Sequence, residues 1–175
     1  MILDDVRIPK DYLVGKEGEG FRMIMEQFDL LRVMVCLSSI GAAAQSLDEA
    51  ITYAKQRTAF GKAIAKFEGI SFKIAEDATL LEAGRWLCYR TLWLKDRGVA
   101  HTKEAAMCKS WVPNIAVKII HDALLIHGHV GYSAEYLLEQ RLRDAIGNEL
   151  ADGSIEAMKL TIVRELLGKE YIAYK

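Results

Sequence analysis

Apolar residues recur every three or four positions over most of the chain, the spacing that gathers them along one side of an α-helix. Three long segments show this spacing: residues 29–57, about 67–97 and about 101–127. In the first segment the apolar stripe consists of Leu30, Val33, Leu37, Ile40, Ala44, Leu47, Ile51 and Ala54. At 1.5 Å per residue, these segments predict three helices of roughly 40 to 45 Å.

Shorter helical patterns follow towards the C-terminus. We expect a loop over residues 127–133 (HGHVGYS), a short helix over about 135–146 and a last helix over about 153–169. Long helices with short connections pack most economically side by side. The sequence therefore predicts an all-α fold, an up-and-down four-helix bundle with extra short helices.

Pro113 lies inside the third long segment. A proline there removes a backbone donor and clashes with the preceding turn, so we expect a kink near Asn114 rather than a break. We also expect Trp111 in this helix and Leu166 in the last helix to face the core.

The N-terminus has a different pattern. Asp5 to Ile8 alternate polar and apolar residues before Pro9, which predicts a short strand. A lone strand is not stable in water, so we expect residues 1–16 to be the remnant of a preceding β-domain or linker, and residues 17–175 to form the bundle. The glycines of residues 15–20 lack the GxGxxG spacing and are interpreted as a flexible lead into a helix.

Composition excludes several classes of protein. The 23 basic and 24 acidic residues give no charge excess for binding nucleic acid or an anionic membrane surface. No apolar run approaches the roughly 20 residues that span a bilayer, and the N-terminus lacks the features of a signal peptide, so we expect a soluble, cytoplasmic protein. The dispersed Cys36, Cys88 and Cys108 are expected to be reduced core thiols.

Metal and nucleophile chemistry find little support. His121, Asp122, His127 and His129 could be combined into a metal site, but the di-iron sites of helix bundles need ExxH pairs on two helices, and the sequence contains none. There is no GxSxG motif and no cysteine in the polar setting of a reactive thiolate. Chemistry is therefore expected at loops and helix ends.

The sequence ADGS, residues 151–154, offers one such acid. A carboxylate before glycine, serine and a helical pattern can cap the N-terminus of that helix, or it can accept a proton from a substrate. From these residues alone, the cap is the favoured interpretation of Asp152.

Four segments carry a resemblance to a known family. They are QRTAFGKAIAKFE (56–68), IHGHVGYSAEY (126–136), RDA (143–145) and ADGSIEAMKLTIVREL (151–166), and in order and spacing they resemble the C-terminal helical domain of acyl-CoA dehydrogenases. The likeness covers nearly the whole chain. It implies an FAD-dependent oxidoreductase of fatty acid metabolism that forms a double bond between the α- and β-carbons of an acyl-CoA thioester.

The same resemblance implies partners and an assembly. Members of the family are commonly homodimers or homotetramers joined through this domain, and an electron-transfer flavoprotein is the expected electron acceptor. Their N-terminal helical domain and most of their β-domain have no counterpart in this sequence. The isolated domain is therefore expected to be inactive.

The resemblance assigns the proton acceptor. The catalytic glutamate of the family stands in YEGT, and ADGS aligns with that motif, so Asp152 takes the position of the base and Gly153 lies beside the substrate. Some members carry the base just before the arginine of the first long helix, where this sequence has Leu31. Aspartate is one methylene shorter than glutamate, so the backbone or the substrate must compensate.

Other positions match substrate and cofactor contacts by resemblance. Asp29 and Arg32 match a DxxR motif that contacts the CoA moiety, with a surface ion pair as the alternative. In relatives the RxxFG motif reaches the FAD of a neighbouring subunit, and here it comprises Arg57, Phe60 and Gly61. Ser154 and Glu156 match FAD contacts too, with ordinary helix-start residues as an equal alternative.

Three expected cofactor positions depart from the family pattern. Glu68 and Leu125 each replace a glutamine, and His129 replaces a glycine. A carboxylate near a pyrophosphate weakens binding unless it faces ribose hydroxyls or is paired. The alternative function is therefore a non-catalytic helical domain, derived from this family and kept for assembly or scaffolding.

Overall fold

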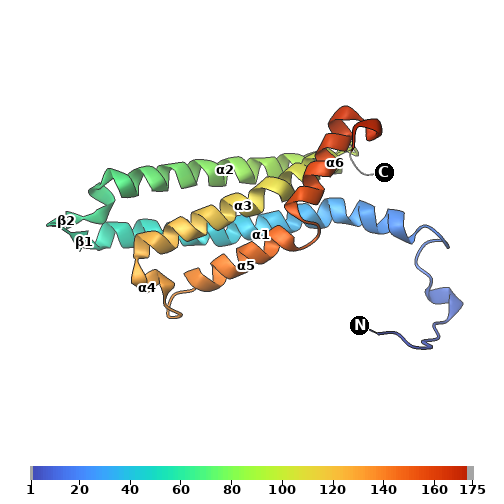
Figure 1. Ribbon diagram of the computed structural model, residues 1–175, viewed down its shortest axis with the longest axis horizontal. Coiled ribbons are helices and arrows are strands. Elements are labelled where there is room, and N and C mark those ends of the chain that lie inside the picture. The colour runs from blue at the N-terminus through green and yellow to red at the C-terminus, as the bar shows by residue number, and fades with distance from the viewer. Residues whose placement is uncertain (1, 173–175) are drawn as a thin grey trace.

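A computed structural model describes residues 2–172, and its long helices run side by side (Figure 1). They are α1 (Gly20–Gln56), α2 (Glu68–Asp96) and α3 (Thr102–His127), and the shorter α5 (Leu138–Leu150) completes a four-helix bundle. The last helix, α6 (Ile155–Leu167), packs against α3 at the end where α1 begins. The predicted fold is confirmed.

Short elements connect the helices. A two-stranded antiparallel hairpin, β1 (Thr58–Ala59) and β2 (Lys62–Ala63), follows α1 and pairs Thr58 with Ala63. Three 3₁₀ helices, η1 to η3, cover Lys10–Tyr12, Ile64–Lys66 and Lys169–Tyr171. A one-turn helix, α4 (His129–Tyr132), lies within residues 127–133, so the expectation of a plain loop there is wrong.

Helix α3 lies at the centre of the core and contacts α1, α2, α5 and α6. Its buried side chains include Ala105, Val112, Ile115 and Ile119. Gly84 on α2 lets that helix approach closely, because a Cβ there would come within 2.7 Å of the Ile115 side chain. These side chains form the core-facing side of α3.

Several expected boundaries and faces are wrong. Helix α1 begins at Gly20, nine residues before the predicted start, α5 extends to Leu150, and α6 begins at Ile155. Trp111 and Leu166 are 38% and 59% exposed rather than inward. An apolar residue beside the buried stripe of a helix stays exposed when no neighbouring helix covers that side.

The described part of the N-terminal segment, from Ile2 onwards, contains no strand. Residues Asp5 to Ile8 are exposed and irregular, because no second strand among the described residues offers backbone partners. The glycine-containing segment 15–19 forms turns before α1, as expected of a lead into a helix.

Helix α3 continues through Pro113 without a break, as predicted, while the bend itself remains a prediction. The amide of Asn114 donates to the Ser110 carbonyl at 3.0 Å. Cys36, Cys88 and Cys108 are buried and free, which confirms the expected core thiols.

Helix α1 is long and apolar enough to cross a membrane by length and composition alone. The statement that no apolar run approaches that length is therefore wrong. In the structure, one side of α1 packs against α2, α3 and α5. Its buried Ser39 and Ser46 satisfy their hydroxyls on carbonyls one turn earlier, those of Val35 and Ala42. The apolar character of α1 belongs to a bundle core.

Candidate active site

The loop between α5 and α6 carries Asp152. Ser154 is the N-cap of α6, and its hydroxyl accepts a hydrogen bond from the Ala157 N–H at 3.3 Å. Asp152 lies two residues earlier and does not cap the helix. The interpretation of Asp152 as a cap is therefore wrong, because an N-cap directly precedes the first helical residue.

Asp152 has a left-handed backbone, with φ of 53°, and Gly153 follows with φ of 107°. Positive φ is uncommon outside glycine, although aspartate tolerates it better than most residues. Within residues 2–172, neither the Asp152 carboxylate nor its N–H has a hydrogen-bond partner. Both groups are therefore available to a ligand.

Cationic side chains hold the backbone of this loop. The Arg32 Nε donates to the Asp152 carbonyl at 3.3 Å. The Lys109 Nζ donates to the carbonyls of Gly153 at 3.0 Å and Glu149 at 3.3 Å. The loop is thus attached to both α1 and α3.

Asp29 and Arg32 form an ion pair at 3.2 Å. Their side chains are only 14% and 10% exposed, and the Thr102 hydroxyl donates to the other Asp29 oxygen at 2.5 Å. The alternative of a surface ion pair is therefore wrong, and this pair instead connects α1 to the Asp152 loop. Contact with CoA remains a prediction. Leu31, between them, is exposed.

The hairpin lies at the opposite end of the bundle (Figure 1). Its two-residue turn places Phe60 and Gly61 at φ of 50° and 77°, the positive values that a type I′ turn requires. Phe60 is 95% exposed. Arg57 ends α1, and its carbonyl accepts from the Ile64 N–H at 2.9 Å, which fixes the base of the hairpin.

The other expected cofactor residues lie at this same end. Glu68 is exposed in the first turn of α2, where the helix dipole favours a negative charge. Leu125 is exposed in the last turn of α3, and His129 is exposed at the start of α4. Within residues 2–172, neither Arg57 nor Glu68 has an ion-pair partner.

The predicted site residues therefore form two groups. Asp29, Arg32 and residues 152–156 lie at one end, and Arg57, Phe60, Gly61, Glu68, Leu125 and His129 lie at the other. Arg32 and Arg57 are 25 residues apart on the continuous α1, which is about 37 Å.

Comparison with known families agrees with this architecture. Residues 18–167 match the acyl-CoA dehydrogenase C-terminal domain. The chain belongs to the acyl-CoA dehydrogenase family. The predicted family is confirmed.

Three related proteins show how far the likeness extends. An acyl-CoA dehydrogenase of Bacillus subtilis (strain 168) is 40% identical over 96% of this chain and 44% of its own length. The CarC subunit of the caffeyl-CoA reductase-Etf complex of Acetobacterium woodii is 40% identical over 97% of this chain and 45% of its own length. The structure of butyryl-CoA dehydrogenase from Megasphaera elsdenii superposes with a TM-score of 0.92 and 34% identity, over 95% of this chain and 43% of that one. The chain spans less than half of each.

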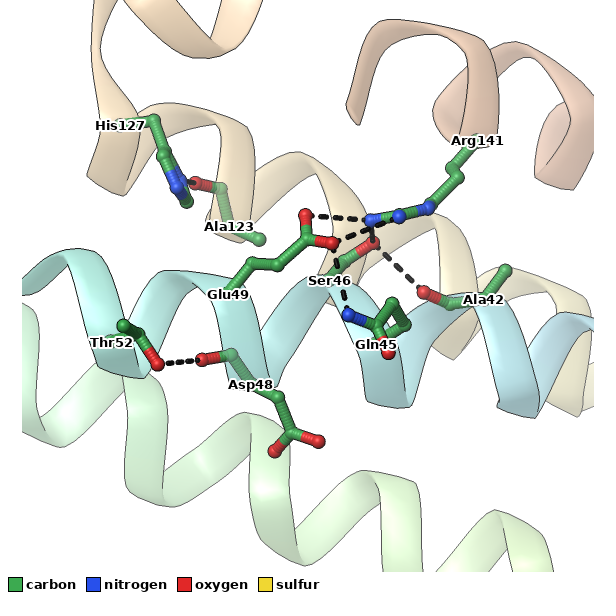
Figure 2. Close-up of polar contacts among 9 residues, drawn as sticks. All are labelled: Ala42, Gln45, Ser46, Asp48, Glu49, Thr52, Ala123, His127 and Arg141. Atoms are coloured by element: carbon green, nitrogen blue, oxygen red, sulfur yellow. Dashed lines mark hydrogen bonds and ion pairs between the residues drawn. The ribbon is translucent and has the colours of Figure 1, made fainter. Parts of the chain in front are cut away.

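A cleft in this acyl-CoA dehydrogenase domain was not anticipated from the sequence. It has a volume of about 320 Å³ and is lined by Gln45, Asp48, Glu49, Thr52, Tyr53, Gln56, His127 and Tyr136. Figure 2 shows the Glu49 carboxylate facing the Arg141 guanidinium, with N–O distances of 2.8 and 2.9 Å. These hydrogen bonds lower the pKa of Glu49, against an opposing effect of burial.

His127 stands at the edge of the same cleft. Its Nδ1 donates to the Ala123 carbonyl at 2.8 Å, and its ring stacks on Tyr53 with centroids 4.4 Å apart (Figure 2 shows the hydrogen bond). The ring orientation is therefore set by the core of the domain.

Asp122, a candidate metal ligand from the sequence, is neutralised by two lysines. The Lys73 and Lys118 ammonium groups donate to its two oxygens at 2.5 and 2.8 Å, and Lys118 also donates to Asp77 at 2.6 Å. Burial raises the pKa of Asp122, but the hydrogen bonds from both lysines outweigh it and the pKa lies below its usual value.

Lys109 was also missed, although the sequence contained a signal. It lies three residues before Val112 and four after Ala105, at a position that faces the core. A charged residue at an apolar position of a helix marks a buried polar contact.

Proposed function

We propose that this chain is the C-terminal domain of an FAD-dependent acyl-CoA dehydrogenase in which Asp152 removes the α-proton of an acyl-CoA thioester. The observation that carries the proposal is the Asp152 carboxylate, free of protein partners within residues 2–172, on a loop held by Arg32 and Lys109. A capping residue would have used its carboxylate on α6, and that task belongs to Ser154.

The reaction requires a base and a donor close together. An α-proton beside a thioester is weakly acidic, so the base must lie within hydrogen-bonding reach while the carbonyl oxygen receives donors. The Asp152 carboxylate serves as the base, and its own N–H donates to the thioester oxygen. Gly153, Asp29 and Arg32 belong to the adjoining part of the CoA site.

FAD, when bound, accepts the hydride that leaves the β-carbon. The hairpin residues fit an FAD nucleotide, because Arg57 has no ion-pair partner among the described residues and a guanidinium matches the geometry of a pyrophosphate. The exposed Phe60 ring offers a surface for stacking. The carboxylate of Glu68, which has no ion-pair partner within residues 2–172, fits ribose hydroxyls rather than phosphates. Leu125 and His129 belong to the FAD site at the hairpin end of the bundle. Ser154 and Glu156 belong to the FAD site at the end that carries Asp152.

The separation of these two groups supports self-association. A cofactor that uses residues at both ends of a bundle, about 37 Å apart on α1, is best served by two chains, with the hairpin of one reaching the flavin beside the Asp152 of another. We therefore propose a homodimer or homotetramer. The CarC relative belongs to an Etf complex, which supports an electron-transfer flavoprotein as electron acceptor.

The N-terminal segment supports an origin in a longer protein. Ile2, Leu3, Val6 and Ile8 each expose more than half of their surface. We propose that residues 1–16 end a preceding β-domain, that the domain alone is inactive, and that the whole protein is a soluble, cytoplasmic enzyme of fatty acid metabolism.

The test uses Asp152→Asn in a protein that joins this chain to the N-terminal and β-domains of a relative. The variant is expected to bind FAD normally but to reduce it with acyl-CoA at least about 10²-fold more slowly, because general base catalysis contributes about 10² to 10⁴. Bleaching of the flavin absorbance measures the rate. Glu165→Gln, which changes an exposed carboxylate on α6, is the control for the base and is expected to reduce flavin normally.

Two outcomes would contradict the proposal. Unchanged bleaching in Asp152→Asn would remove Asp152 from the role of base. Absence of any bleaching in the unmodified protein, with FAD and acyl-CoA both bound, would favour the non-catalytic assembly domain.

A further inference from the structure

Lys109 is an unusual residue in this fold. It is fully buried in the third turn of α3, and it is among the largest side chains that expose no surface. Lysine is almost never fully buried unless it is paired with a charge. Within residues 2–172, however, no carboxylate lies within ion-pair distance of its Nζ. Its position therefore has to be explained by the groups that it does contact.

Both hydrogen-bond acceptors of Lys109 are backbone carbonyls of the segment that carries Asp152. Glu149 lies in the last turn of α5, where carbonyls have no partner within the helix and a cation interacts favourably with the helix dipole. Gly153 directly follows Asp152. Lys109 therefore joins the end of α5 to the far side of the loop, on either side of the acid.

Arg32 holds a further carbonyl, within the loop itself. Its Nε donates to Asp152 itself, and Asp29 holds its Nη1. Two loop carbonyls and the carbonyl of Glu149 in α5 are thus held by two cations, one from α1 and one from α3. The left-handed backbone of Asp152 is strained for a residue with a side chain, so it persists only when its surroundings hold it.

The charge environment agrees with this role. Burial lowers the pKa of Lys109, and the nearby Cys36 and Asp152 oppose that change. An ammonium group offers three donors and no acceptor, which suits a site that contains only carbonyls.

We propose that Lys109 is a positioning residue for Asp152: by holding the carbonyls of Glu149 and Gly153, it sets where the carboxylate meets the acyl thioester. The inference rests on the proposed function of Asp152. An aspartate has one torsion fewer than a glutamate with which to adjust, so the position of its backbone matters more. A misplacement of about 1 Å in a catalytic group can slow a reaction about 10²-fold.

The first measurement needs no activity. Hydrogen exchange is followed at Ala151, whose N–H donates to Gly147, and at Ala157, whose N–H donates to Ser154. In Lys109→Met, which keeps the volume but loses the donors, both amides are expected to exchange about tenfold faster relative to core amides, as for the loss of a hydrogen bond. Lys118→Met is the matched control, because Lys118 lies on the same helix and holds Asp77 and Asp122 instead of the loop. Lys118→Met is expected to leave the exchange rates of both amides, relative to core amides, unchanged.

The second measurement uses the flavin-loaded protein joined to the missing domains. Lys109→Met is expected to lower kcat about 10²-fold while FAD content stays the same and KM for acyl-CoA changes less than about threefold. Loss of overall stability alone would lower the amount of active protein but not produce this division between kcat and KM. If Lys109→Met does not fold, Lys109→Gln, which keeps a shorter donor, is expected to show the same pattern more weakly.

The outcomes separate the two proposals. Unchanged loop exchange in Lys109→Met would overturn the anchoring role, whatever Asp152 does. Unchanged kcat in Lys109→Met, together with loss of flavin reduction in Asp152→Asn, would overturn the positioning role and leave the proposed function standing. If Asp152→Asn reduces flavin normally, the proposed function fails and the positioning role fails with it, while the exchange data still report whether Lys109 holds the loop.

Discussion

Glu49 and Arg141 meet across the bundle, from α1 to α5, through two hydrogen bonds at the edge of the cleft. Their side chains are 30% and 17% exposed, so the pair is only partly screened by solvent. Since the bonds to Arg141 lower the pKa of Glu49, the ionised form stabilises the fold. This contribution is complete above the unfolded pKa, about 4.3, and is lost as the pH falls through the lower folded value.

Glu49→Gln should therefore destabilise the chain by about 1 to 2 kcal/mol at neutral pH, because a bidentate charged pair is replaced by a weaker contact and Arg141 loses its counter-ion. The difference from the unmodified chain should shrink as the pH falls below the unfolded pKa of about 4.3. Urea unfolding over this pH range measures it. Asp48→Asn, at an exposed neighbour, serves as the control and should change stability by less than about 0.5 kcal/mol. A difference independent of pH would contradict the assigned ion pair.

At the scale of one element, the hairpin between α1 and α2 combines strain with exposure. Phe60 takes a positive φ, although asparagine before glycine is the preferred pair for this kind of turn, and its ring is left in solvent. Strain of this kind tends to occur where function requires a particular side chain. The sequence motif indicated a cofactor loop, and only the structure showed that its aromatic residue is held against its conformational preference.

Phe60→Asn should stabilise the isolated chain by about 1 kcal/mol, since it removes the cost of a left-handed phenylalanine. In the protein with all its domains, the same change should lower the FAD content, because the stacking ring is lost. Thermal unfolding and the ratio of flavin to protein measure the two effects. Gly61→Ala is the matched comparison at the next position of the turn. Its added Cβ would meet no atom within 4 Å, so this variant should lose stability only because alanine disfavours a φ of 77°. Full flavin content in Phe60→Asn would exclude Phe60 from the cofactor site.

At the scale of the whole molecule, the bundle leaves one side of α2 without a partner. Phe72, Trp86 and Trp93 lie at multiples of seven residues along that helix and are each more than half exposed. Trp86 and Trp93 are seven residues apart, a spacing by which one helix packs against another, and Thr79 occupies the position between Phe72 and Trp86. Exposed apolar patches of this kind mark surfaces that bind other proteins, and a second copy of this chain agrees with the separated cofactor residues.

The double variant Trp86→Lys, Trp93→Lys should weaken self-association at least about 30-fold, since each buried interface tryptophan contributes about 2 kcal/mol or more. Sedimentation over a range of concentrations measures the effect. Tyr12→Lys, at an exposed aromatic residue outside the bundle, should leave association unchanged. An unaltered oligomer in the double variant would place the interface elsewhere.

The sequence by itself determined the long helices and the family, because helical periodicity and motifs are local and are written in consecutive residues. Of the eight residues in the predicted α1 stripe, four are buried: Val33, Ile40, Leu47 and Ala54. The distance between the two groups of site residues follows from the number of residues between Arg32 and Arg57, because α1 is continuous and each of its residues adds a fixed rise. The sequence did not predict that Asp5 to Ile8 form no strand, because a strand depends on a partner strand.

Only the tertiary structure decided which polar groups meet. Arg32 and Asp152 are 120 residues apart in the chain, and Glu49 and Arg141 are 92 apart, so no local pattern joins either pair. The same holds for Lys109, whose helix position indicated burial but not its partners in the α5–α6 loop. These contacts depend on how the helices pack against one another, and packing is a property of the whole bundle.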